Sequence, residues 1–431
     1  MKHKLPGLSI ASLFLLLLSC QSDNPAPFTY PDSALQASPK ILATNTAGVK
    51  VYNGGFGSGL AVVPNSTGSF YLLTDRGPNV DGTLKDSKIF AKPDFTPLIG
   101  KFTLKNDSLV LESTIELKTS TGVKLTGLPN PPGYGATGEG AYDTNGNLLD
   151  NDIEGIDSEG LVAAADGTFW ISDEYGPHIT HFSQNGQTIE RINPFGTGTG
   201  GRKLPAVFAT RRANRGMEGL AITPDNKTLV GIMQSTMYNP SSAAIVNKKL
   251  TRIVFFDIAT AATKQYVYLQ DANGLSNCDI VAITNTTFLV LERDGDFPQD
   301  SKSPAVYKRV YKIDVSSATD VSDATNGANG KLYGGKTLEQ LTDAELQSNS
   351  ITPVTKTLVV DLLQAIPGYP HDKPEGLTII DNNMIAVAND DDFGILNDSN
   401  TPNNYMAKVL PATNKTDRGT IYFIKLSTSL K

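Results

Sequence analysis

The sequence predicts an all-β protein built as a single β-propeller. The main observation is a strand–turn–strand unit that occurs five times, and such internal repetition is typical of propellers and related β arrays. The chain also contains 39 Gly and 25 Pro, and it has few long helical periodicities. This composition favours short strands joined by many turns. The five units are Gly57–Asn79, Ser158–Ile179, Arg215–Ser235, Ser276–Phe297 and Lys373–Gly394.

Carboxylates mark both ends of the repeated unit, most clearly in Ser158–Ile179. Glu159 heads its first strand, Asp166-Gly167 supplies the turn, and Asp173 and Glu174 close its second strand. In a propeller the first strand lines the central channel and the second runs antiparallel beside it. The residue that heads strand one therefore lies on the same side as the residue that ends strand two.

Applied to every copy, this geometry predicts a ring of polar side chains around one mouth of the channel. The strand heads are Glu159, Glu218, Asp279 and Glu375, and the strand ends are Asp75, Asp173, Glu174, Glu292, Asn389 and Asp390. So many carboxylates need raised pKa values or a compensating cation. Hard oxygen ligands suit Ca²⁺ or Mg²⁺. Alternatively, each Glu that precedes Gly-Leu caps backbone N–H groups of the adjacent blade.

Residues 1–20 are predicted to be an export signal. Lys2, His3 and Lys4 precede the apolar run Leu8–Leu18, which is too short to span a membrane as a mature helix. The run ends in a sequence that resembles the bacterial lipobox, so Cys20 is the expected lipidation site and residues 21–39 a tether. The predicted product is an exported lipoprotein of the bacterial cell envelope, attached to a membrane only through this anchor. An ordinary signal peptide is the alternative, and the membrane face stays open.

Further strand-like segments follow each unit and complete the predicted blades. After the fifth unit only Gly419–Lys425 remains, whereas a spare segment, Lys40–Tyr52, precedes the first unit. We therefore expect Lys40–Tyr52 to complete the last blade and close a ring of five blades, which removes a free sheet edge. A sixth blade could lie in Lys118–Ile156 or Ser317–Thr352. Residues 40–431 then form one domain.

Charge and cysteine content exclude several classes of function. The net charge is −7, with 37 Lys and Arg against 44 Asp and Glu, so nothing indicates a nucleic-acid partner. Cys278 is the only cysteine besides Cys20, which leaves no intrachain disulfide in the mature chain, and we expect it to be buried.

Long insertions are predicted at Lys118–Ile156, Ser317–Thr352 and Asp392–Arg418. A short helix is expected to open at Thr342, and Gly133–Glu139 is a candidate cover for the channel mouth.

Several short motifs occur together in a fixed order along residues 50 to 426. They are Thr74-Asp75-Arg76-Gly77-Pro78, Glu159-Gly160-Leu161, Ser172-Asp173-Glu174-Tyr175-Gly176-Pro177, Asn214-Arg215-Gly216-Met217-Glu218-Gly219-Leu220, Leu291-Glu292-Arg293-Asp294, Pro374-Glu375-Gly376-Leu377 and Asp390-Asp391-Asp392-Phe393. This pattern resembles the phytase-like family, which is described as having esterase-like activity and is assigned to the propeller superfamily. The resemblance implies a propeller, of six blades by analogy with propeller phytases, and an ester or phosphoester hydrolase.

The motifs that the chain lacks narrow the chemistry. There is no G-x-S-x-G elbow, and only His178, His181 and His371 follow the export signal, too few for a His-rich metal centre. Ester hydrolysis would then be metal-assisted, with a carboxylate as base. The substrate would be an anionic or ester small molecule, a phosphate or carboxylic ester.

The predicted roles follow from these positions. The catalytic candidates are Glu159, Asp173, Glu174 and His178. The metal ligands are predicted to be Glu159, Glu218, Asp279, Glu375 and Asp390. The substrate-binding candidates are Arg76, Arg211, Arg212 and Arg293, although these cations could instead neutralise the acidic ring. A non-enzymatic surface propeller that binds a ligand or protein partner, with a structural metal only, remains the alternative function.

Overall fold

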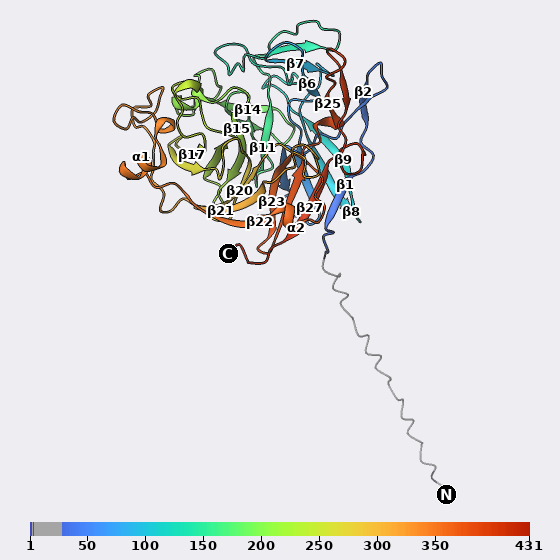
Figure 1. Cartoon of the computed structure of the whole chain (residues 1–431). Coiled ribbons are helices and arrows are strands. Elements are labelled where there is room, and N and C mark those ends of the chain that lie inside the picture. The colour runs from blue at the N-terminus through green and yellow to red at the C-terminus, as the bar shows by residue number, and fades with distance from the viewer. Residues whose placement is uncertain (2, 4–27) are drawn as a thin grey trace.

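The computed structural model describes residues 1, 3 and 28–431 (Figure 1). The fold is mostly β, with several antiparallel sheets of four strands, which confirms the all-β prediction. The predicted export signal and Cys20 lie outside the described residues, apart from Met1 and His3.

Three of the sheets each contain one repeated unit and the two strand segments that follow it, as predicted. The first is β11 (Ser158–Ala163), β12 (Phe169–Asp173), β13 (His178–Phe182) and β14 (Thr188–Ile192). The second is β15 (Met217–Ile222), β16 (Thr228–Met233), β17 (Leu250–Asp257) and β18 (Thr263–Leu269). The third is β19 (Ser276–Ala282), β20 (Thr287–Arg293), β21 (Lys308–Asp314) and β22 (Thr355–Asp361). Buried apolar residues between neighbouring sheets form the core.

The first and fifth units share one sheet of eight strands. One half is β4 (Gly59–Val62), β5 (Ser69–Leu73), β8 (Leu98–Lys105) and β9 (Ser108–Glu116). The other half is β23 (Pro374–Asp381), β24 (Met384–Asn389), β27 (Thr420–Lys425) and β1 (Ser33–Gln36). The halves meet because β1 pairs antiparallel with β27 and parallel with β9.

The prediction that Lys40–Tyr52 completes the last sheet was wrong. Lys40–Tyr52 forms a separate hairpin, β2 (Ile41–Thr44) and β3 (Lys50–Tyr52), whereas β1 lies within the predicted tether. A short strand suffices here because its inward residues are held from both sides. Ala34 is 1% exposed in a core cluster, and the Tyr30 ring lies 5.0 Å from that of Phe423.

The first strands of the five units, β4, β11, β15, β19 and β23, contact one another in cyclic order. Glycines allow this close approach. A Cβ atom on Gly160 would lie 2.4 Å from the Leu220 nitrogen, and one on Gly219 would lie 2.6 Å from the Ile280 nitrogen. Because these glycines follow Glu159 and Glu218 directly, the close contact also fixes where the two carboxylates lie.

Smaller elements lie in the insertions and in other connections between the strands. A three-stranded sheet contains β6 (Asn79–Asp81), β7 (Ser87–Phe90) and β10 (Gly140–Asp143), and a two-stranded sheet contains β25 (Ile395–Asn397) and β26 (Tyr405–Ala407). The helices are α1 (Asp343–Ser348), α2 (Leu362–Ala365), η1 (Ala206–Thr210), η2 (Ser242–Ala244), η3 (Leu338–Gln340) and η4 (Asp392–Gly394). Thr342 caps α1, as predicted. Neither Lys118–Ile156 nor Ser317–Thr352, both fully described, contains another four-stranded sheet.

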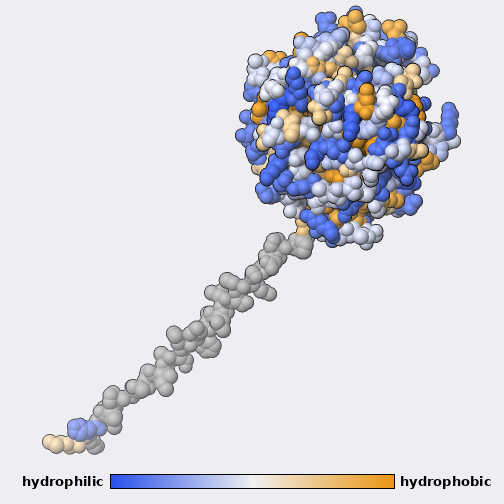
Figure 2. All heavy atoms as spheres, turned by 90° about the vertical axis from the view of Figure 1, so that its left-hand side faces the viewer, coloured by the Kyte–Doolittle hydropathy of each residue, from blue (hydrophilic) through white to orange (hydrophobic). Residues whose placement is uncertain are grey.

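Apolar side chains are scattered among polar ones on the face seen in Figure 2. Within residues 28–431, no helix is long and apolar enough to cross a membrane.

The buried position of Ala34 makes β1 testable. Ala34→Asp should lower the free energy of unfolding by about 3 kcal/mol, because it buries a carboxylate in the apolar cluster between the two halves of the eight-stranded sheet. Urea denaturation followed by circular dichroism measures the change. The matched control is Leu35→Asp on the outward face, where the side chain is 40% exposed and the cost should be small. Equal stabilities of both variants and the parent would contradict this account of β1.

Candidate functional site

A polar cavity of about 530 Å³ lies where the first strands of the repeated units begin. Residues of β6 and β25 line it from the insertions. The carboxylates that line it are Asp75, Asp81, Asp157, Glu159, Glu174, Glu218, Glu375, Asp390 and Asp392. The cations that line it are Arg76, Lys88, Arg212, Arg215, Arg293 and Lys373. We call this space the axial cavity.

Three of the four predicted strand heads lie together in this cavity: Glu159, Glu218 and Glu375. The prediction for Asp279 was wrong by one residue, because Cys278 occupies the glutamate position and Asp279 the position of the following glycine. Its carboxylate accepts from the backbone nitrogens of Ile280 and Leu377, both at 2.8 Å. Asp279 therefore bridges two neighbouring first strands and does not line the axial cavity.

The capping alternative thus applies to Asp279 and not to the glutamates. Within the described residues, no backbone N–H group donates a hydrogen bond to Glu159, Glu218 or Glu375.

Some of the predicted strand-end residues also lie one position away from the residues that line the cavity. Asp75, Glu174 and Asp390 line the cavity, together with Gln234 and Arg293 of the other two units. Asp173, Glu292 and Asn389, each one residue earlier, do not line it. Successive residues of a strand face opposite sides, so only one of two adjacent acids can reach the cavity.

Asp173 and His178, both predicted to be catalytic, instead form a buried network with Arg191. His178 Nδ1 lies 2.5 Å from Asp173 Oδ2, and Arg191 Nη2 donates to the same oxygen at 2.9 Å. Burial, with Arg191 nearby, lowers the pKa of His178 to about 4, so the ring is neutral at physiological pH. Asp173 Oδ1 accepts from the Asp157 nitrogen at 3.1 Å. The network therefore positions Asp157, a residue that the sequence reading missed.

Asp157, Glu159 and Glu174 form the tightest group of carboxylates at the cavity. One oxygen from each lies within 4.8 Å of the others. Burial raises the pKa of Asp157 to about 6, and burial with repulsion from Glu218 raises the pKa values of Glu159 and Glu174 well above their usual range. This all-oxygen set fits a hard divalent cation such as Ca²⁺ or Mg²⁺, whose charge would offset the repulsion.

A second group contains Glu218, Cys278 and Glu375, again with ligand atoms within 4.8 Å. Burial raises the pKa of the Cys278 thiol, so this sulfur stays protonated and is a poor metal ligand. Cys278 is buried, as predicted. Glu218 Oε2 is buried and has no hydrogen-bond partner among the described residues, so a cation in the cavity would also satisfy this oxygen.

Arginines face the carboxylates across the cavity. Arg76 Nη1 lies 3.2 Å from Glu139 Oε2, and its Nε lies 3.5 Å from Asp157 Oδ2. Arg293 pairs with Glu375. Arg76 and Arg293 thus each have a carboxylate partner, and both also line the cavity.

Of the two adjacent arginines, Arg212 lines the cavity and Arg211 does not. Arg211 donates to the carbonyl oxygens of Tyr175, Gly135 and Ala136 at 2.6, 2.9 and 2.9 Å. It thereby ties the Gly133–Glu139 segment to Tyr175. Glu139 of this segment pairs with Arg76 of the cavity wall, but no residue of the segment lines the cavity.

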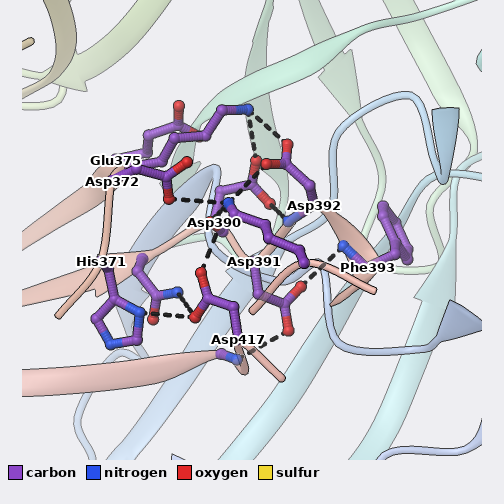
Figure 3. A network of polar contacts seen from close by, with 12 residues as sticks. His371, Asp372, Glu375, Asp390, Asp391, Asp392, Phe393 and Asp417 are labelled. Carbon is purple, nitrogen blue, oxygen red and sulfur yellow. Dashed lines mark hydrogen bonds and ion pairs between the residues drawn. The ribbon is translucent and has the colours of Figure 1, made fainter. Parts of the chain in front are cut away.

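Lys373 and Asp392 extend the polar wall, and sequence reasoning assigned neither to the site. Lys373 Nζ lies 2.6 Å from Asp392 Oδ1 and 3.2 Å from Asp390 Oδ2. Lys408 Nζ binds Asp392 Oδ2 at 2.6 Å, and Figure 3 shows the whole network around Asp390 and Asp417. Lys373 could have been found because it precedes Pro374-Glu375 directly, as Asp157 precedes Ser158-Glu159.

A protein-family model matches most of the chain. A family described as "Phytase-like: Esterase-like activity of phytase" matches residues 52–393. The chain belongs to this phytase-like family. The match contains every residue that lines the axial cavity except the three of β25, Ile395, Leu396 and Asn397.

Individual relatives are distant. An "Uncharacterized secreted protein" of Arthroderma benhamiae is 27% identical over 348 residues, which cover 65% of this chain and 67% of the relative. A crystal structure of a Lactobacillus plantarum protein is 10% identical, with a TM-score of 0.36, and the match covers 91% of this chain and 99% of that one. Streptogramin B lyase is 10% identical, with a TM-score of 0.31 and coverage of 87% and 94%.

The buried acids make the stability of metal-free protein depend on pH. Burial is the main cause that raises the pKa values of Asp75 and Glu218 to about 8, from 3.8 and 4.5. Between about pH 4 and about pH 8 the folded state therefore binds more protons than the unfolded state, so the free energy of unfolding should fall as pH rises. Urea denaturation in the presence of a chelator measures this slope.

The control is the double variant Asp75→Asn, Glu218→Gln, which removes both titrating groups. The free energy of unfolding of this variant should fall clearly less steeply with pH than that of the parent. A stability that rises with pH over this range in chelator would contradict the assignment.

Proposed function

We propose that this protein is a metal-dependent hydrolase of phosphate or carboxylic esters that acts in the axial cavity. The observation that carries the proposal is the placement of the Asp157, Glu159 and Glu174 oxygens within 4.8 Å of one another, in a cavity that arginines also line. Membership of a family described by esterase-like activity supports the reaction class.

Asp157, Glu159 and Glu174 would hold the cation, with Glu218 as a further oxygen donor. A divalent cation supplies Lewis-acid polarisation of the ester oxygen and a lower pKa for water. Arg76, Arg215 and Arg293 bind and orient the anionic oxygens of the substrate, since guanidinium groups match phosphate and carboxylate geometry.

Asp75 is the proposed general acid. Its pKa of about 8 keeps a proton on the carboxyl near neutral pH, and it lines the cavity wall from which it can donate to the leaving oxygen. Asp173 and His178 act only by holding Asp157 in place.

We further propose that the three four-stranded sheets and the two halves of the eight-stranded sheet are the five blades of one closed propeller. Two observations support this: the first strands contact one another in cyclic order, and β1 pairs with β27 beside β9. The close packing at Gly160 and Gly219 is what a narrow channel requires.

Activity should depend on both the metal and the carboxylates. We expect purified protein to hydrolyse p-nitrophenyl phosphate or p-nitrophenyl acetate with added Ca²⁺ or Mg²⁺, and chelator to abolish this turnover. Glu159→Gln and Glu174→Gln should each lower kcat/KM by about 100-fold or more, because each removes a proposed ligand. Release of p-nitrophenol measures the rate, and isothermal titration with Ca²⁺ measures cation binding.

Glu190→Gln is the matched control, because Glu190 is a buried, ion-paired glutamate that does not line the cavity. Its activity should stay close to that of the parent. Cation binding without turnover on either ester would contradict the hydrolase proposal and favour a binding propeller with a structural metal.

Export with a lipid anchor at Cys20 is also proposed. The relative named as a secreted protein supports export, and the lipobox-like sequence supports the anchor. In a bacterial host, the parent should fractionate with membranes and incorporate labelled palmitate, whereas Cys20→Ala should lose the label. A parent chain that is released without label would contradict lipidation.

A further inference from the structure

A second cavity, of about 670 Å³, lies on the flank of the molecule where β1 meets β27. It shares no lining residue with the axial cavity. Leu35, Pro39, Tyr52 and Leu410 give it apolar walls, and the β2–β3 hairpin contributes through Tyr52. Its volume is in the range of cavities that hold small organic ligands. We call it the flank cavity.

The charged groups of the flank cavity have one sign. Lys415 and Arg418 line it, and no carboxylate does so among the described residues. In a chain of net charge −7, a wall with only cations is the reverse of the overall balance. An anionic group would be attracted here, because nothing on the wall repels it.

Arg418 has donors to spare. Its Nη2 donates to the Gln36 carbonyl oxygen at 2.5 Å, which holds the side chain against β1. Its Nε is buried and makes no hydrogen bond to any described residue. Because Arg418 lines the cavity, a ligand oxygen that accepts from its remaining guanidinium N–H groups would gain a strong charge-assisted bond.

Hydrogen bonds link Asp417, His371 and Tyr422 and hold the polar side chains of the flank cavity in place. His371 Nδ1 lies 2.7 Å from Asp417 Oδ1, and its Nε2 lies 2.9 Å from the Tyr422 hydroxyl. Asp417 is placed within the ion-pair network of Figure 3, where Lys408 Nζ lies 3.6 Å from Asp417 Oδ2. A carboxylate can only accept, so Asp417 accepts from the Nδ1–H group of His371. His371 and Tyr422 both line the cavity.

We propose that the flank cavity binds a small organic carboxylate with an apolar body. The carboxylate would lie between Lys415 and Arg418, and the apolar body would pack on Leu35, Tyr52 and Leu410. An apolar wall alone would favour a neutral ligand, and a cationic wall alone would favour a small inorganic anion. Only an amphipathic anion uses both surfaces.

Octanoate and 1-octanol are the test pair, because they share an alkyl chain and differ in charge. Isothermal titration of the purified protein should show octanoate binding at one site per chain and much weaker binding of octanol. Lys415→Glu should weaken octanoate binding about tenfold or more, since it replaces attraction by repulsion beside the carboxylate.

The matched control is Lys425→Glu, an exposed lysine on β27 that does not line the cavity and carries the same change of net charge. It should leave octanoate binding within about twofold of the parent, because its charge is remote and screened by salt. Circular dichroism verifies that both variants are folded. Equal affinities for octanoate and octanol, equal effects of the two substitutions, or no octanoate binding would each overturn the proposal.

Discussion

The close contact between neighbouring first strands is the constraint on which the rest of the structure depends. Backbone approaches backbone where Gly160 meets Leu220 and where Gly219 meets Ile280, and no side chain larger than hydrogen fits between them. The residue before each glycine then emerges at the rim of the axial cavity. In the fourth unit an aspartate replaces the glycine, and its carboxylate binds the Leu377 N–H of the next strand directly. The same contact is therefore made by two different means.

Crowding of carboxylates is the electrostatic consequence of this packing. Burial raises the pKa values of Glu159, Glu174 and Glu218, and repulsion from Glu218 raises those of Glu159 and Glu174 further, so the fold gathers charges that repel. Arginines and lysines around the wall offset part of the repulsion, but Glu218 Oε2 remains without a partner among the described residues. Such an arrangement costs stability and is typical of functional sites, where unfavourable groups are retained for what they bind.

Much of the fold could be predicted from the sequence because its signals are local and repeated. Apolar runs and Gly or Asn at turns indicate the strands and turns of each unit. The start of helix α1 at Thr342 is likewise marked by the local sequence, because Thr342 caps that helix. The strand β1 could not be found in this way, because four residues inside a polar segment carry no periodic signal. It is a strand only because β27 and β9 offer partners on both sides.

The site was predicted in outline, with errors of one residue at its edges. Glu159, Glu218 and Glu375 lie together, yet Asp173, Glu292 and Asp279 face elsewhere. Strand alternation separates Asp173 from Glu174, but a sequence with acids at both positions does not show which one faces the cavity. Asp157 was missed because it precedes its strand and reaches the cavity through hydrogen bonds that only the fold creates.

Differences among the five units argue against a purely structural role for the ring. A group needed to hold each sheet together would recur in all of them, as the close contact at the glycine position does. The head position instead carries Ser58, Glu159, Glu218, Cys278 and Glu375 in turn. The cavity-facing strand ends carry Asp75, Glu174, Gln234, Arg293 and Asp390. The second unit thus supplies two acids, Glu159 and Glu174, whereas the fourth supplies none and carries Arg293 instead. This asymmetry gives the cavity an acidic group suited to a cation and a basic group suited to an anionic substrate, which is the division that the proposed metal-assisted hydrolysis would use.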